Sequence, residues 1–234
     1  MLTFYDSMKT PLSLLAALLV SAAAPAQDCS GYFFAQEGTD VEMTSFDRKG
    51  SPAGRVTYHV KEARKSGNSL DAVLTTIAYD EKGKELAAAR DLTLQCRNGT
   101  YLMDMKNFVM PETMSAFKNS EVKFSGSMVE YPAALAEGTA LPDAEFLMEP
   151  SALPMMKTTV TLSNRKVVGR ESVRTPAGSF DCYKITYDGS VKSLVGLKYQ
   201  ATEWFRPGFG LVKSETYRNG KLMGSTVLSK YGKR

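Results

Sequence analysis

The stretch "TPAGSFDCYKITYD", Thr175 to Asp188, joins a tight-turn signal to the clearest strand pattern in the chain. Pro176 fixes its own φ angle, and Gly178 accepts the positive φ that a turn needs before a strand. Because side chains alternate along a strand, Phe180 and Cys182 are expected on one face. The opposite face is expected to carry Tyr183, Ile185 and Tyr187. Both faces are largely apolar, which predicts a strand packed on both sides and a structural motif in place of a catalytic one.

Similar alternating segments recur along the chain, separated by Asp, Asn, Gly, Lys and Pro. Asn98-Gly99 and Asn219-Gly220 are the dipeptides that tight type I′ hairpins favour. Residues 107–120 look helical, with Pro111 suited to a first turn, so a short helix is expected near 110–118. The expected strands are residues 41–47, 55–62, 72–79, 92–96, 101–105, 122–131, 158–164, 180–187, 197–205, 211–217 and 222–231. The sequence therefore predicts an all-β fold with one short helix, an antiparallel meander curled into a barrel, half-barrel or sandwich.

An apolar run near the N-terminus, Leu12 to Ala24, ends in Ala24-Pro25-Ala26, the small-x-small pattern that signal peptidase accepts. A membrane-spanning helix needs roughly 20 apolar residues, so this run is too short for one. We expect residues 1–26 to be a cleaved signal peptide, with Met8 as the start that gives it a basic leader. Residues 27–234 would form a single antiparallel β domain, periplasmic or secreted and without a transmembrane span.

Charge and motif content argue against several functions. The 29 Lys and Arg and 25 Asp and Glu are scattered, without the basic cluster and stacking aromatics of a nucleic-acid-binding protein. The sole histidine, His59, is expected on a polar strand face with Thr57 and Lys61. One histidine excludes a two-histidine metal site, and nucleophile-elbow, phosphate-loop and dinucleotide motifs are absent from the sequence. We therefore expect no enzymatic activity, metal or cofactor, although carboxylate pairs assembled in space stay open.

The cysteines, Cys29, Cys96 and Cys182, are separated by 67 and 86 residues, which is not a metal-ligand spacing. In an exported protein an odd number suggests one disulfide and one free thiol. Cys29 lies near the N-terminus and Cys96 beside a hairpin, so this pair would clamp the first residues to the sheet, and mid-strand Cys182 would be a buried small hydrophobe. A lipid anchor on Cys29 is the alternative, but Asp28 and Gln27 do not suit lipoprotein processing.

Methionine is concentrated in one segment, Met103 to Met156, which holds eight of them. Methionine fills irregular gaps in cores and also lines surfaces that accept variable apolar ligands. In the expected helix, Met110, Met114 and Phe117 recur at the spacing of one apolar stripe. Ordinary core packing and the lining of an apolar-ligand cavity both explain such a stripe.

Several of these motifs resemble a known family. "TPAGSFDCYKITYD" (175–188) with "EWFRPGFGLVKSETYRNGKLMGSTVL" (203–228) resembles the C-terminal half of the TapB-like family of exported bacterial β-rich proteins of unknown function. "CSGYFFAQEGTDVEMTSFDRKG" (29–50) is similar to the family's start, although "YFFAQEG" and "FRPGFG" depart from its usual residues. The resemblance implies a curled sheet in the bacterial envelope, similar to periplasmic lipoprotein-carrier folds, and it implies no catalytic residues.

Two functions stay open. The favoured one is a non-catalytic envelope protein that binds a lipid, an acyl chain or another apolar ligand inside the curled sheet, with the Met-rich helix as cover. The alternative is an interaction or assembly module that pairs an exposed strand edge with an envelope protein partner. A hydrolase is the least supported class.

Overall fold

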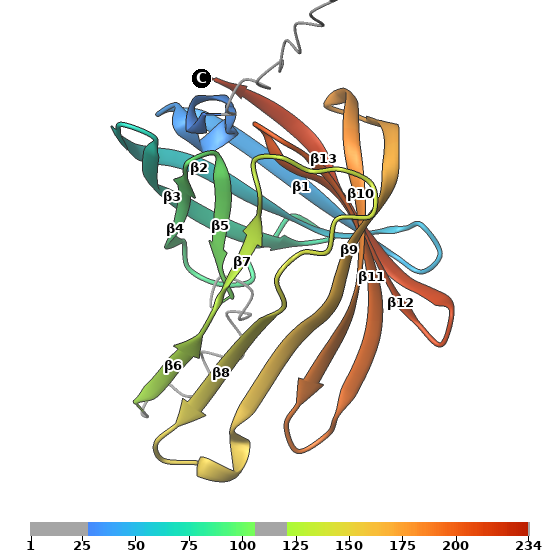
Figure 1. Ribbon diagram of the computed structural model, residues 1–234. Helices are drawn as coiled ribbons and strands as arrows, with labels where there is room; N and C mark the ends of the chain where they lie inside the picture. Colours follow the sequence, from blue (N-terminus) through green and yellow to red (C-terminus); the bar gives the residue numbers. More distant parts are fainter. Residues whose placement is uncertain (1–27, 106–120, 234) are drawn as a thin grey trace, which may run out of the picture.

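The computed structural model describes residues 28–105 and 121–233, which form one antiparallel sheet of 13 strands rolled into a nearly closed barrel (Figure 1). The strands are β1 (Thr39–Asp47), β2 (Pro52–Ser66), β3 (Ser69–Asp80), β4 (Arg90–Arg97), β5 (Thr100–Asp104), β6 (Val122–Gly126), β7 (Met128–Tyr131), β8 (Ala144–Pro150), β9 (Thr158–Thr175), β10 (Gly178–Lys192), β11 (Leu197–Arg206), β12 (Gly210–Arg218) and β13 (Lys221–Lys233). The short 3₁₀ helices are η1 (Cys29–Gly31), η2 (Phe33–Ala35) and η4 (Pro154–Met156). The all-β prediction is confirmed. The expected signal peptide and the expected helix with Met110, Met114 and Phe117 lie outside the described residues.

The barrel closes through one short stretch of chain. The strand order is β6-β8-β9-β10-β11-β12-β13-β1-β2-β3-β4-β5-β7, so the two outermost strands follow each other in sequence, with only Ser127 between them. Gly126 has a φ of 145°, and a Cβ there would lie 2.2 Å from the carbonyl oxygen of Glu145. Only glycine allows this approach, so the kink between β6 and β7 depends on it.

The turn signals in the sequence produce the expected hairpins. Asn98 and Gly99 have φ angles of 51° and 78°, and Asn219 and Gly220 have 51° and 72°. These are the two positive φ angles of type I′ turns, which match the twist of the flanking strands. Gly178 has a φ of 134° directly after the β9–β10 turn, as its place behind Pro176 predicts.

Three regions differ from the expectation. The expected strand 122–131 is divided at Ser127 into β6 and β7, which lie at the two ends of the strand order. β8 lies between residues 131 and 158, where no strand was expected, although its alternate residues Ala144, Phe146 and Met148 are buried. β9 continues to Thr175, well beyond the expected end at Asn164. The reason is a β-bulge at Asn164, which shifts the alternation by one residue and so hides the second half of the strand from a period-two pattern.

Buried side chains form two clusters on opposite faces of β10 and β11. The larger one, the interior core, lies inside the barrel and includes Ile185 and Phe205. The smaller one, the second core, includes Phe180, Cys182 and Trp204. The prediction that this strand is packed on both faces is therefore confirmed, with Phe180 and Cys182 on one side and Ile185 on the other.

A disulfide joins Cys29 to Cys96, the pair expected from the sequence, with 5.7 Å between their Cα atoms. In this form the Cys29 sulfur is not available for a lipid anchor. Cys182 is free and buried, and burial raises the pKa of its thiol to about 12, so it remains a neutral packing group.

We predict that the double substitution Cys29→Ser/Cys96→Ser lowers the free energy of unfolding by about 4 kcal/mol, because the disulfide restricts a long loop in the unfolded chain. Urea unfolding with and without reductant measures this loss. The control is Cys182→Ala, which should keep its sensitivity to reductant. An unfolding midpoint of the unaltered protein that does not respond to reductant would contradict the prediction.

Candidate functional site

The bulge in β9 turns an arginine into the barrel. Ser163 pairs with Asp188 and Lys166 pairs with Thr186, so two residues of β9 stand opposite one residue of β10. Asn164 takes the extra position with a φ of 56°, a conformation that asparagine tolerates better than most residues. The residue after it, Arg165, then faces inward and is only 2% exposed.

Arg165 has both a structural contact and unused hydrogen-bonding capacity. Its Nη1 donates to the carbonyl oxygens of Pro142 at 2.7 Å and Glu130 at 3.2 Å, which holds the β7–β8 connection against the barrel. Its Nε and Nη2 are buried without a hydrogen-bond partner. Arginine stays protonated in proteins, so a positive charge with free donors lies in the interior.

A buried carboxyl group lies close to this charge. Glu203 of β11 is 5% exposed and accepts hydrogen bonds from the hydroxyls of Tyr131 at 2.7 Å and Tyr187 at 2.9 Å. Tyr131 links the two charged residues, because its ring centroid also lies 5.0 Å from Cζ of Arg165. We call these four residues, Arg165, Glu203, Tyr131 and Tyr187, the polar cluster.

Burial controls the ionisation of the polar cluster. It raises the pKa of the Glu203 carboxyl, and the tyrosine hydroxyls and the Arg165 charge offset this only in part. Burial and the neighbouring Glu203 also raise the pKa values of Tyr131 and Tyr187 well above the usual range. Both tyrosines therefore remain neutral donors at any physiological pH.

A stack of aromatic rings connects the polar cluster to the segment that follows Cys29, which the Cys29–Cys96 disulfide joins to the sheet. The rings of Tyr131 and Phe205 are stacked with centroids 4.3 Å apart, and Tyr101 lies 5.6 Å from Tyr131. Tyr101 in turn stacks on Tyr32 at 5.5 Å, and the Tyr32 hydroxyl donates to the carbonyl oxygen of Gly99. Residues that follow Cys29 thus pack directly into the interior core above the cluster.

The part of the barrel wall next to the polar cluster is mostly apolar. Residues that pair directly across β8 to β11 point to the same face of the sheet. On the inward face these residues are Phe146, Met148, Val160, Leu162, Ile185, Gly189, Tyr199 and Ala201. The Tyr199 ring lies flat over Gly189, where a Cβ would meet the ring at 2.1 Å. The interior surface therefore combines an apolar wall with one charged, hydrogen-bonding end.

The residues singled out from the sequence lie elsewhere. Pro176 lies in the β9–β10 turn, Gly178 is the first residue of β10, and Phe180 and Cys182 belong to the second core. Sequence reasoning missed Arg165 and Glu203. The available signal was the break in alternation at "SNRKV" (163–167), which marks a bulge.

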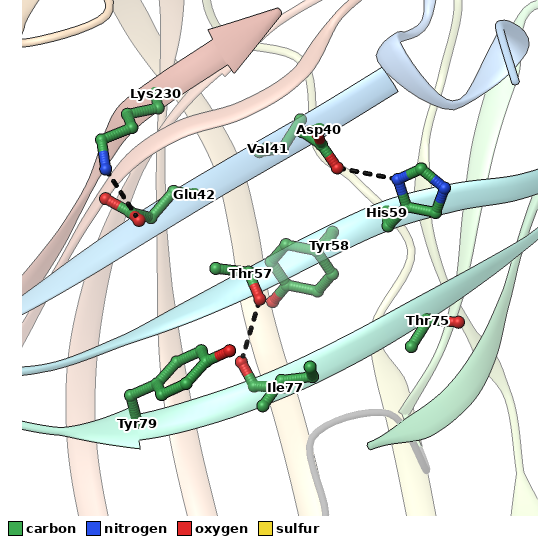
Figure 2. A pocket seen from close by; sticks show the side chains of 10 residues that line it. All are labelled: Asp40, Val41, Glu42, Thr57, Tyr58, His59, Thr75, Ile77, Tyr79 and Lys230. Atoms are coloured by element: carbon green, nitrogen blue, oxygen red, sulfur yellow. Dashed lines mark hydrogen bonds and ion pairs between the residues drawn. The ribbon is translucent and has the colours of Figure 1, made fainter. Parts of the chain in front are cut away.

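A pocket of about 510 Å³ lies on the outer face of β1, β2 and β3 (Figure 2). His59 and Asp40 face each other across neighbouring strands there, with Nδ1 and Oδ1 2.7 Å apart. The His59 side chain is 44% exposed, as expected for a solvated strand residue. In the part of the chain that the structure describes, no three His, Cys, Asp or Glu side chains are grouped to hold a metal ion.

We predict that Glu203→Gln gains stability relative to the unaltered protein as the pH rises. The folded protein holds the Glu203 proton more tightly than the unfolded chain, in which the pKa of this carboxyl group is near 4.5. Stability of the unaltered protein is therefore lost as the pH rises from that value through the raised pKa of the folded state. Urea unfolding between pH 4 and pH 8, expressed as the difference between the two proteins, measures it.

The control for this pH series is Glu145→Gln, which replaces an exposed carboxyl group on β8. Its difference from the unaltered protein should change much less over the same pH range. A Glu203→Gln difference that is constant, or that moves in the opposite direction, would contradict the prediction.

Among the described residues, helices long and apolar enough to cross a bilayer are absent. No curated protein matches the sequence significantly. Two crystal structures have the same fold. One is a protein from Bacteroides fragilis, described as exported and YmcC-like in fold, with 24% identity, a TM-score of 0.70, and 85% of this chain and 97% of that chain covered.

The other is a protein from Parabacteroides distasonis, described as a lipoprotein, with 24% identity, a TM-score of 0.70, and 86% of this chain and 98% of that chain covered. A family model, DUF3108-like, matches residues 36–228, which is most of the chain. The comparisons show a family and a β fold, and they do not support the TapB-like name that the motifs suggested. The chain belongs to the DUF3108-like family.

Proposed function

We propose that the protein is a non-catalytic component of the bacterial envelope that binds an apolar or lipid-like ligand inside the curled sheet. The observation that carries the proposal is the interior surface, where an apolar wall on β8 to β11 ends at the polar cluster. An amphipathic molecule has the same division, with an apolar chain and an oxygen-bearing head group. Two nitrogens of Arg165, Nε and Nη2, have no hydrogen-bond partner, and their N–H groups suit the acceptor oxygens of a carboxylate, ester or phosphate.

Export is part of the same proposal. The apolar run Leu12 to Ala24 with its small-x-small end supports a cleaved signal peptide. The two structural relatives are themselves described as exported and as a lipoprotein. The Cys29–Cys96 disulfide is a further support, because disulfides persist in oxidising compartments such as the periplasm.

The alternative, partner binding through a strand edge, stays a prediction that the topology favours less. Within the described residues, the outermost strands are β6 and β7, and they are five and four residues long. β-Augmentation needs a row of free backbone groups, and strands this short offer few.

We predict that protein purified without detergent carries a lipid-like molecule, and that Val160→Asp abolishes this binding. Val160 lies on the inward face of β9, so a carboxylate there would oppose an apolar chain. Native mass spectrometry and organic extraction measure the bound molecule and identify its head group. Thr161→Asp, one residue further along and on the outward face, is the matched control and should retain the ligand.

Both variants are compared with the unaltered protein by circular dichroism and thermal unfolding, so that a loss of ligand is separated from a loss of fold. Unaltered protein that carries no extractable lipid, with its interior filled by its own side chains, would refute the proposed function.

A further inference from the structure

One end of the barrel presents large apolar side chains to solvent. The strand register brings the end of β8, the start of β9, the end of β10 and the start of β11 together, since Thr158 pairs with Met148, Thr159 with Lys192, and Val191 with Leu197. The β8–β9 and β10–β11 connections therefore lie at the same end of the sheet, at the bottom of Figure 1.

These two connections are far more apolar than ordinary surface turns. Val195 is 82% exposed, Met155 is 74% exposed and Leu194 is 69% exposed. We call the exposed apolar residues of the two connections the apolar rim: Leu153, Met155, Leu194, Val195 and Leu197. With Phe124 of β6, which pairs with Met148, this end holds six of the ten exposed large hydrophobic residues of the described chain.

Lysines surround the apolar rim. Lys192 and Lys198 flank the β10–β11 hairpin tip in "KSLVGLK" (192–198), and both are exposed. Lys123 on β6 is exposed, and Lys157 pairs with Glu149 at 3.0 Å. Within the described part of the chain the remaining acid nearby is Glu121, so four described lysines stand against two described glutamates at this end. A negatively charged surface complements this arrangement.

We propose that this end of the barrel docks on a bilayer that contains anionic phospholipid. The residues of the apolar rim lie exposed on two turn tips, so they suit insertion into a fluid surface that needs no matching shape. Leu194, Val195 and Met155 would enter the boundary between head groups and acyl chains, and Lys192 and Lys198 would lie at the phosphates. This is how peripheral proteins combine apolar insertion with electrostatic attraction.

Vesicle flotation tests the proposal with protein recovered from the cell envelope. The vesicles are phosphatidylcholine alone, or phosphatidylcholine mixed with phosphatidylglycerol. Unaltered protein should float with the anionic vesicles and less with the neutral ones, and high salt should weaken the binding. Leu194→Ser/Val195→Ser should lower the partition about tenfold or more, and Lys192→Glu/Lys198→Glu should remove the preference for anionic vesicles.

Val168→Ser is the matched control. Val168 is 39% exposed. It lies ten residues along β9 from Thr158, which is at the rim end of the strand, and ten residues of a strand span about 33 Å. It should bind as the unaltered protein does. Met155→Ser tests the second turn independently, in case the hairpin variant is poorly folded, and should also lower the partition.

All proteins compared carry the same N-terminus, checked by mass spectrometry, so residues 1–27 contribute equally to every measurement. The proposal is overturned if the unaltered protein does not float with anionic vesicles, if the variants of the apolar rim float as well as it does, or if Val168→Ser loses as much binding. Ligand extraction is measured separately, so failure here leaves the proposed interior site unaffected.

Discussion

Unpaired backbone groups at the two ends of a 13-strand sheet are the constraint on which this structure depends. β6 and β7, which follow each other in sequence, satisfy this constraint together, because β6 pairs with β8 and β7 pairs with β5. Closure in this way curls the sheet and creates an inside, because one face of every strand near the seam must then point inward. Gly126 permits the kink, and the backbone N–H of Ser127 donates to Glu145 at 2.8 Å to hold it.

The polar cluster follows from the same closure. Tyr131 is the last residue of β7, so the segment that closes the barrel also delivers the ring that lies between Arg165 and Glu203. The bulge at Asn164 adds the second requirement, since without it Arg165 would face outward. A buried guanidinium and a buried carboxyl group are costly in an apolar interior unless they are paired or hydrogen-bonded. Their presence beside an apolar wall is a feature that packing alone does not explain.

The interior surface and the apolar rim belong to the same part of the barrel. The inward face of β8 to β11 runs toward the end where the β8–β9 and β10–β11 connections project. A protein that takes up an amphipathic molecule from a bilayer would need the interior surface and the apolar rim in the same part of the barrel. The two proposals are nevertheless independent, because exposure and charge support one and the buried inward face supports the other.

The class of fold, its hairpins and its disulfide could all be predicted from the sequence. Asn-Gly turns, Pro176 and Gly178 act through local backbone preferences, and the alternation around Phe180 and Cys182 reports two buried faces directly. The Cys29–Cys96 pair could be argued from the places of the three cysteines in this pattern. The near-closure of the barrel and the position of Tyr131 against both Arg165 and Glu203 came from the tertiary structure alone. These features depend on pairing between strands that are distant in sequence and on the one-residue shift at Asn164, which breaks the alternation of β9 without indicating what Arg165 contacts.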